Sequence, residues 1–141
     1  MKPINKFIAV LHEKGFKATP QRIEISKILS QNKKHPTAEE VYYKVREKFP
    51  TISPATVYKT IQLLKESGKV QELAFYDKKT RFDTNMEPHI NLVCQKCGRI
   101  EDLNDLKVKE FIKQFSVKSG FKIEGHRIDF YRICRYCENR I

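Results

Sequence analysis

The four cysteines of the chain form two C-x-x-C pairs, "CQKC" at Cys94 and Cys97 and "CRYC" at Cys134 and Cys137. Each pair can present two thiolates from one tight turn, and two such turns complete the tetrahedral sulfur shell that Zn²⁺ prefers. Because all four cysteines are then used, no coordination position stays open, and the zinc is expected to be structural. Zinc ribbons usually have about 15–20 residues between the pairs, whereas residues 98–133 separate them here. We therefore expect a strand and a helix between the two turns.

Two other uses of the cysteines compete with zinc. Disulfides suit oxidising compartments, and a single C-x-x-C can be a redox motif when it stands in a βαβ setting. The sequence has no secretory signal and no apolar run near the roughly 20 residues that span a membrane. We therefore expect a cytoplasmic protein without a membrane segment, in which disulfides are disfavoured. A βαβ setting is missing at both pairs, so a thiol oxidoreductase is only a distant alternative.

Charge indicates a polyanionic partner. The chain has 28 Lys and Arg against 17 Asp and Glu, a net charge of +11, with the basic residues interleaved among apolar ones. Such a field attracts polyanions, and nucleic acid is the commonest one in the cytosol. A high positive charge also fits a protein that is merely soluble, so motifs must decide between these readings.

The first half of the chain shows helical periodicity with clear start signals. Helices are predicted in "INKFIAVLHEKG", in "TPQRIEISKILSQ" from an N-cap at Thr19, and in "SPATVYKTIQLLKESG". Another is predicted in "TAEEVYYKVREKF", where Thr37 and Glu40 can form a capping box. The segments "KVQELAFYD" and "TRFD", joined at Lys78 and Lys79, predict a β-hairpin. Short helices followed by a hairpin indicate a winged helix-turn-helix.

In a winged helix-turn-helix the last helix enters the major groove of DNA. A helix in an ordinary bundle can have the same composition, but the basic charge and the hairpin favour DNA binding. A module for RNA or single strands is a third possibility, for which we expect a platform of stacking aromatics. The aromatic residues mostly occupy periodic apolar positions instead. The face of the last helix that points away from the core is expected to carry Ala55, Thr56, Tyr58, Lys59 and Gln62.

Several motifs together resemble the ferric uptake regulator (Fur) family of metal-dependent transcription regulators. They are "HPTAEEVY", "SPATVYKTIQLLKESG", "RFD", "PHINLVCQKCGRIEDL" and "GFKIEGHRIDFYRIC", in the order seen in that family. The resemblance covers nearly the whole chain and implies an α+β protein. It implies a winged-helix DNA-binding domain over residues 1–83, a hinge over 84–88, and an α/β dimerisation domain with the structural zinc over 89–141.

The resemblance also implies what the protein binds. We expect a homodimeric repressor on double-stranded operator DNA, an A/T-rich palindrome. Lys17, in "KATPQR", matches the family residue that reaches the minor groove, and Arg22 is expected near phosphates. The outward side chains Ala55, Thr56, Tyr58 and Lys59 are expected in the major groove. The family consists of regulators, so we expect no enzyme activity.

Five further side chains carry nitrogen or oxygen donors: His35, Asp83, His89, Asn91 and Asp102. Imidazole and carboxylate suit Fe²⁺, Mn²⁺ or Zn²⁺. From the residues alone, each also has an ordinary structural use in a turn, an ion pair or a strand end, and no pattern joins position 35 to position 89. The resemblance joins them, because these positions match the family's regulatory ligands, with Asn91 where a histidine usually stands. It implies that Fe(II) or Mn(II), bound by both domains, fixes a dimer that fits DNA.

The identity of the regulatory signal depends on two of these residues. Asp102, five positions after Cys97, resembles the peroxide-sensing (PerR-type) branch, in which bound Fe²⁺ reacts with hydrogen peroxide and a histidine ligand is oxidised. His35 and His89 are then the expected targets. Asn91 departs from the pattern, since an amide is a weaker donor than imidazole, so a Fur-type iron or Zur-type zinc repressor is the alternative. The family's second metal site is expected to be missing, because its positions hold Pro88, Ile90 and Lys109 beside His126, which we interpret as a strand residue.

Overall fold

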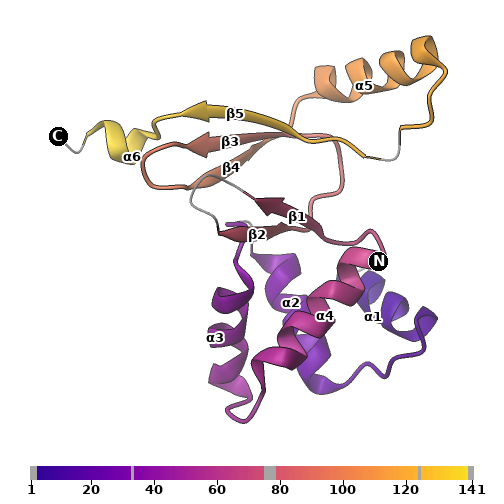
Figure 1. Ribbon diagram of the computed structural model, residues 1–141, viewed down its shortest axis with the longest axis vertical. Coiled ribbons are helices and arrows are strands. Elements are labelled where there is room, and N and C mark those ends of the chain that lie inside the picture. Colours follow the sequence, from indigo (N-terminus) through magenta and orange to yellow (C-terminus); the bar gives the residue numbers. More distant parts are fainter. Residues whose placement is uncertain (1–2, 33, 75–78, 124, 140–141) are drawn as a thin grey trace. The chain divides into compact units, whose positions relative to one another are not determined.

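A computed structural model describes residues 3–32, 34–74, 79–123 and 125–139 (Figure 1). The chain divides into two compact units, Met1–Met86 and Glu87–Ile141, called the N-terminal and C-terminal units below. Within the described ranges, no helix is both long and apolar enough to cross a membrane.

Four helices make up most of the N-terminal unit: α1 (Pro3–Glu13), α2 (Pro20–Gln31), α3 (Ala38–Lys48) and α4 (Pro54–Glu66). The predicted helix starts are confirmed. The hydroxyl of Thr19 accepts the Arg22 amide at 3.3 Å, and Ser53 caps α4 in the same way. Thr37 and Glu40 form the expected reciprocal capping box. Each hydroxyl satisfies an amide that has no partner within its own helix.

The hairpin consists of β1 (Gln71–Ala74) and β2 (Thr80–Asp83), paired antiparallel. The predicted end of its first strand and the turn residue Lys78 lie outside the described residues. β2 also touches the segment before α3, because the Phe82 amide donates to the Pro36 carbonyl at 3.0 Å. Four helices followed by a two-stranded wing form a winged helix-turn-helix. Its core is built from apolar side chains of every helix and of the wing: Phe7, Val10, Ile25, Leu29, Ala38, Val41, Val45, Ile52, Val57, Ile61, Leu64, Val70 and Phe82.

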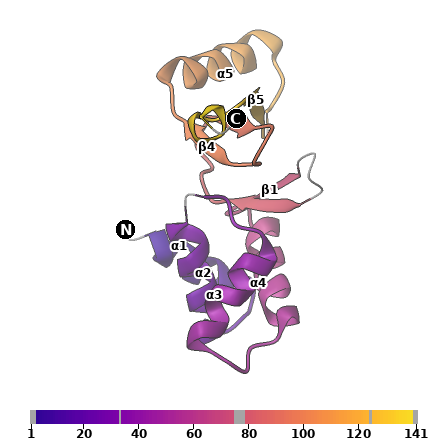
Figure 2. The same ribbon diagram turned by 90° about the vertical axis from the view of Figure 1, so that its left-hand side faces the viewer.

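The C-terminal unit is a three-stranded sheet of order β4-β3-β5 (Figure 1) with one longer helix, which lies to one side of the strands in Figure 2. Its elements are β3 (Ile90–Cys94), β4 (Ile100–Leu103), α5 (Leu106–Ser119), β5 (Ile128–Arg132) and the short α6 (Arg135–Glu138). β3 pairs antiparallel with β4 and parallel with β5. The expected strand and helix between the two cysteine pairs are present as β4 and α5, and β5 follows them.

One prediction about this unit is wrong. His126 lies before β5 and not in a strand. The reason is the register, in which Ile90, the first residue of β3, pairs with Ile128. Residues before Ile128 therefore face no strand, and the ladder cannot extend back to His126.

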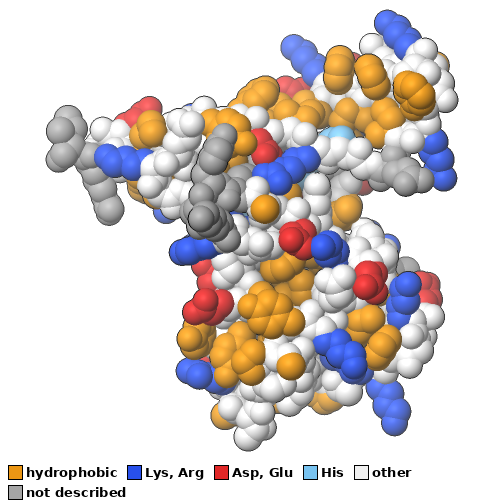
Figure 3. All heavy atoms as spheres, in the orientation of Figure 1, with side chains coloured by type: hydrophobic (Ala, Val, Ile, Leu, Met, Phe, Trp, Pro, Cys, Tyr) orange, Lys and Arg blue, Asp and Glu red, His pale blue; other side chains and the backbone are white. Residues whose placement is uncertain are grey.

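Helix α5 buries none of its side chains within the chain. It starts at the N-cap Asp105, whose carboxylate accepts the Lys107 amide at 2.8 Å, and it ends at Gly120 in the left-handed region with φ +68°. Hydrophobic side chains gather over α5 on the face drawn in Figure 3. A surface that exposes this much apolar area is typical of an interface. The large exposed apolar residues of α5, the segment after it and β5 are Leu106, Phe111, Phe115, Val117, Phe121, Phe130 and Tyr131.

Candidate metal sites and DNA-binding surface

The two cysteine pairs come together in the C-terminal unit. Cys94 ends β3, and the turn after it closes through a 2.9 Å hydrogen bond from the Gly98 amide to the Cys94 carbonyl. Gly98 has a φ of +75°, a conformation that favours glycine. Cys134 is the N-cap of α6, and the Cys137 amide donates back to its carbonyl at 2.9 Å. Each pair therefore lies on one tight turn, as the spacing predicts.

The four thiols fit a zinc ion. Their sulfurs all lie within 4.8 Å of one another, and Sγ of Cys97 is 3.7 Å from Sγ of Cys134. A regular tetrahedron with Zn–S bonds of about 2.3 Å has S···S edges of roughly 3.8 Å. All four cysteines are free, so disulfides do not use them. A four-cysteine site suitable for structural zinc is therefore present.

Backbone amides stabilise the thiolate form of Cys94, the form that binds metal. Burial opposes the charged form of Cys94, but amides of Cys134, Cys97 and Lys96 donate to its sulfur and lower the pKa to about 6. Burial and the three neighbouring sulfurs raise the pKa of Cys137 to about 12. A bound Zn²⁺ displaces such protons, because its charge stabilises thiolates.

A second group of donors lies at the start of β3, also in the C-terminal unit. Nδ1 of His89 is 2.7 Å from the carbonyl oxygen of Glu87. A carbonyl only accepts, so Nδ1 carries the proton and the lone pair is on Nε2. Nε2 lies 3.1 Å from Oδ1 of Asn91 and 3.7 Å from Oδ1 of Asp102. Nε2 of His89 therefore faces two oxygen atoms that, like itself, accept hydrogen bonds. A metal ion between these atoms, or a second proton on the ring, would stabilise the arrangement.

The orientation of the Asn91 amide is fixed by a residue that we did not predict. Nδ2 of Asn91 donates to the carboxylate of Asp129 at 3.0 Å, which turns Oδ1 toward His89. Asp129 is held in turn by Arg127, at 2.7 Å. Asn91 and Asp129 are register partners on β3 and β5. No sequence signal announces this pairing, because residues so far apart in the chain meet only through the parallel register.

In the N-terminal unit, the structure brings His35 and Asp83 together. Nε2 of His35 is 3.5 Å from Oδ2 of Asp83, with exposed fractions of 2% and 5%. The other carboxylate oxygen of Asp83 accepts the Asn85 amide at 2.9 Å. His35 has a φ of +55°, and no other non-glycine residue in the described ranges has a positive φ. Histidine tolerates this region better than most residues do, so the backbone aims a buried imidazole at a buried carboxylate.

The expected DNA-contacting residues lie on the outside of the N-terminal unit. On α4, Ala55, Tyr58 and Lys59 are exposed, with Tyr58 at 57%, while Thr56 is half-buried and takes part in the cap with Ser53. Lys17 is exposed, and Arg22 donates to its carbonyl oxygen at 2.8 Å.

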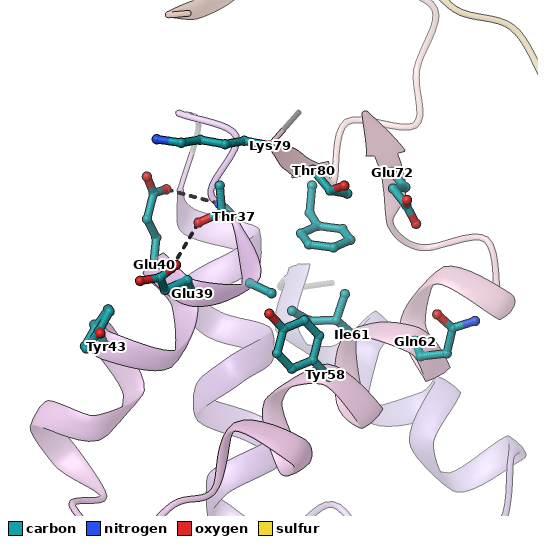
Figure 4. A pocket seen from close by; sticks show the side chains of 12 residues that line it. Thr37, Glu39, Glu40, Tyr43, Tyr58, Ile61, Gln62, Glu72, Lys79 and Thr80 are labelled. Carbon is teal, nitrogen blue, oxygen red and sulfur yellow. Dashed lines mark hydrogen bonds between the residues drawn. The ribbon is translucent and has the colours of Figure 1, made fainter. Parts of the chain in front are cut away.

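A cavity of about 590 Å³ borders one side of α4 (Figure 4). Tyr58 forms part of its wall, and Ala38, Ile61 and Phe82 are apolar residues of its lining. Three carboxylates and one ammonium line it as well. These charged residues are Glu39, Glu40, Glu72 and Lys79.

A sequence model of the ferric uptake regulator family matches residues 13–131. The chain belongs to this family. The peroxide-responsive repressor PerR of Staphylococcus epidermidis is 36% identical over 135 residues, which make up 96% of this chain and 90% of that protein. The corresponding repressor of Staphylococcus aureus (strain Mu50) is 34% identical over 137 residues, 97% of this chain and 93% of that one.

Solved structures of Fur-family regulators agree with this assignment. The peroxide stress regulator of Campylobacter jejuni is 38% identical with a TM-score of 0.76, and the match covers 92% of this chain and 98% of that one. The Helicobacter pylori ferric uptake regulator, at 21% identity and a TM-score of 0.77 over 99% and 98% of the two chains, supports the fold. Members of the family are dimeric DNA-binding regulators and not enzymes. The comparisons support a metal-dependent transcriptional repressor of the PerR type, and the Fur-type or Zur-type alternative is not better supported.

Proposed function

We propose that this PerR-type repressor binds duplex operator DNA as a homodimer when Fe(II) or Mn(II) occupies its regulatory site, and that it releases DNA after peroxide. The observation that carries the proposal is the convergence of His89, Asn91 and Asp102, three acceptors placed around one point as metal ligands require. His35 and Asp83 form a second imidazole–carboxylate pair. We also propose that the protein acts in the cytoplasm, where its operator DNA would be found.

We propose that all five of these side chains hold one regulatory metal. His35 and Asp83 belong to the N-terminal unit, whereas His89, Asn91 and Asp102 belong to the C-terminal unit. A metal that binds one arrangement of the two units more tightly than others shifts the population toward it. The favoured arrangement is the one in which the two recognition helices of a dimer match successive major grooves. Residues 84–88 act as the hinge in this proposal.

The regulatory site differs from the family pattern at Asn91, and this difference sets its affinity. The neutral amide oxygen is a weaker donor than the imidazole usually found there. The hydrogen bond to Asp129 keeps that oxygen pointed at His89, so Asn91 remains usable as a ligand. Fe(II) held at this site would react with hydrogen peroxide, and His35 and His89 would be the histidine ligands open to oxidation.

The test is metal-dependent DNA binding followed by peroxide. Protein purified without air and loaded with Fe²⁺ or Mn²⁺ should bind a duplex selected from a random pool, and metal-free protein that keeps its zinc should bind about tenfold or more weakly. Peroxide should then release the Fe²⁺ form and add one oxygen to His35 or His89, measured by peptide mass spectrometry. The Mn²⁺ form should resist. Unmodified histidines in an iron-loaded sample that keeps its DNA affinity would reject peroxide sensing in favour of plain metal availability.

A matched variant, Asn91→His, separates metal affinity from DNA binding. It restores the usual imidazole, so half-maximal activation should occur at a lower free Fe²⁺ or Mn²⁺ concentration. Affinity for DNA at saturating metal should not change. An unchanged activation midpoint would remove Asn91 from the ligand set.

Exposed residues of α4 form the proposed base-reading surface, with Lys17 in the minor groove and Arg22 near phosphates. Tyr58 and Ala55 can contact thymine methyls, Lys59 can reach base edges or phosphates, and Thr56 supports the start of the helix. The carboxylates Glu39 and Glu40, which line the same cavity as Tyr58, repel phosphates. The DNA backbone is therefore expected on the side of α4 that carries Lys59.

Tyr58→Ala should relax sequence specificity, because a base contact of this kind discriminates by about 1–3 kcal/mol. Lys17→Ala or Arg22→Ala should weaken binding to all duplexes alike and reduce the slope of log affinity against log salt. Affinity for operator and scrambled duplexes over a salt series measures both effects. If Tyr58→Ala binds its operator as tightly and as selectively as the wild type, α4 is not the recognition helix.

The exposed apolar side chains of α5, the segment after it and β5 form the proposed dimer interface. Leu106, Val117 and Phe121 are 72–77% exposed. Exposure of apolar surface to water is unfavourable, and a second copy of the chain that covers these side chains removes that free-energy cost. We propose one structural Zn²⁺ per chain in the same unit, held by Cys94, Cys97, Cys134 and Cys137.

A further inference from the structure

The ring of Phe16 contacts two basic side chains from different helices of the N-terminal unit. The guanidinium carbon of Arg22 on α2 lies 5.2 Å from the ring centroid, and Nζ of Lys59 on α4 lies 5.7 Å from it. Both distances are within the roughly 6 Å over which a ring face attracts a cation. Arg22 also donates to the carbonyl oxygen of Lys17 at 2.8 Å. Three segments that carry proposed DNA contacts therefore meet at one aromatic ring.

The end of α1 holds Phe16 in place. The Phe16 amide donates to the Leu11 carbonyl at 2.8 Å, across a Gly15 with φ +76°. This pattern caps a helix with a glycine in the left-handed region and commonly adds an apolar contact from the next residue. A leucine at position 16 provides such a contact equally well, because it needs only apolar surface. It provides no ring face for a cation.

We propose that Phe16 is a positioning residue of the DNA-binding surface. Its ring restrains Arg22 and Lys59, and through Arg22 the Lys17 backbone, before DNA arrives. Long basic side chains lose conformational entropy when a complex immobilises them, and this loss weakens binding. A ring that has already restrained them reduces this loss and also offsets the mutual repulsion of two neighbouring cations. The inference rests on the proposed DNA-binding function.

The test is Phe16→Leu, with Phe16→Tyr as the conservative variant, both in the Mn²⁺-loaded full-length protein. The probe is the duplex selected from a random pool by the wild type, and affinity is measured by fluorescence anisotropy. Phe16→Leu should bind about three- to tenfold more weakly, the factor expected from one mobile basic side chain. Phe16→Tyr keeps a ring face and should bind within about twofold of the wild type. The midpoint temperature of thermal unfolding should be the same for Phe16→Leu, Phe16→Tyr and the wild type. If Phe16→Leu does not fold, Phe16→Met removes the ring in its place.

Two further measurements separate positioning from capping. In a Lys59→Met background, Phe16→Leu should have a smaller effect than in the wild type, because a ring cannot position an absent cation. Tyr43→Leu is the matched control, since it removes a ring 5.1 Å from Arg46 on α3 and should not change DNA affinity. Unchanged or tighter binding by Phe16→Leu, full additivity with Lys59→Met, or a Phe16→Tyr variant as weak as Phe16→Leu overturns the inference. A wild type that selects no duplex overturns the proposed function itself.

Discussion

Removal of zinc should unfold the C-terminal unit and dissociate the homodimer. Among the described residues of this unit, α5 buries no side chain and the sheet consists of three short strands, so other internal support is small. Binding of structural zinc contributes about 10–16 kcal/mol in small zinc domains, as much as the whole stability of a typical domain, about 5–15 kcal/mol. Cys134→Ser should therefore lose zinc, sheet structure and dimer together. Metal content, circular dichroism and analytical ultracentrifugation check the three losses.

The control for this prediction uses the wild type. A strong chelator should reproduce the variant's behaviour, and added Zn²⁺ should reverse it, while a reductant alone should do nothing because the cysteines are free thiols. The N-terminal unit has a core of its own and should keep its helices. A zinc-free protein that stays folded and dimeric would contradict the structural role of the four cysteines.

His35→Ala should abolish metal-stimulated DNA binding and leave the fold, the zinc and the dimer intact. The imidazole is buried against Asp83 at 3.5 Å, and its loss removes a ligand proposed in the N-terminal unit without disturbing the proposed ligands of the C-terminal unit. The activation ratio, DNA affinity with metal over affinity without it, should fall from about tenfold or more toward one. The competing interpretation, a histidine that only stabilises a turn, predicts a loss of about 1 kcal/mol or less with an unchanged ratio.

The backbone at position 35 calls for a second variant. Histidine adopts a φ of +55° more readily than alanine does, so His35→Ala changes local strain as well as the ligand. Asparagine tolerates this conformation and offers only an amide oxygen. His35→Asn should be as stable as the wild type and should respond only at higher metal concentration. Full metal response in His35→Asn at the wild-type concentration would assign the residue to the turn.

Local signals predicted much of the fold. The helix starts at Thr19, Thr37 and Ser53 depend on side chains within three residues of the amides that they cap, so sequence alone reveals them. The meeting of the two C-x-x-C turns is also evident from the sequence, because one tetrahedral ion needs all four sulfurs.

Contacts that depend on register or on loop placement were beyond sequence reasoning. Asp129 meets Asn91 only because β5 runs parallel to β3 in one register, and a shift by one residue would point it to the opposite face. The same register leaves His126 outside the strand, against our prediction. The ring of Phe16 reaches Lys59 through the packing of α1 against α4, which no periodicity specifies.

Strand β3 joins the four-cysteine site to the proposed regulatory ligands of the C-terminal unit. His89 directly precedes it, Asn91 lies within it, and Cys94 is its last residue. Five steps of about 3.3 Å separate the first from the last, and strand pairing keeps that spacing only while the sheet is formed. Because we expect the sheet to depend on zinc, we also expect an order of loading in which a newly made chain takes up zinc first and forms its regulatory site afterwards. Zinc-starved cells should then accumulate repressor that does not respond to iron or manganese. Its target genes should be expressed even when peroxide is absent.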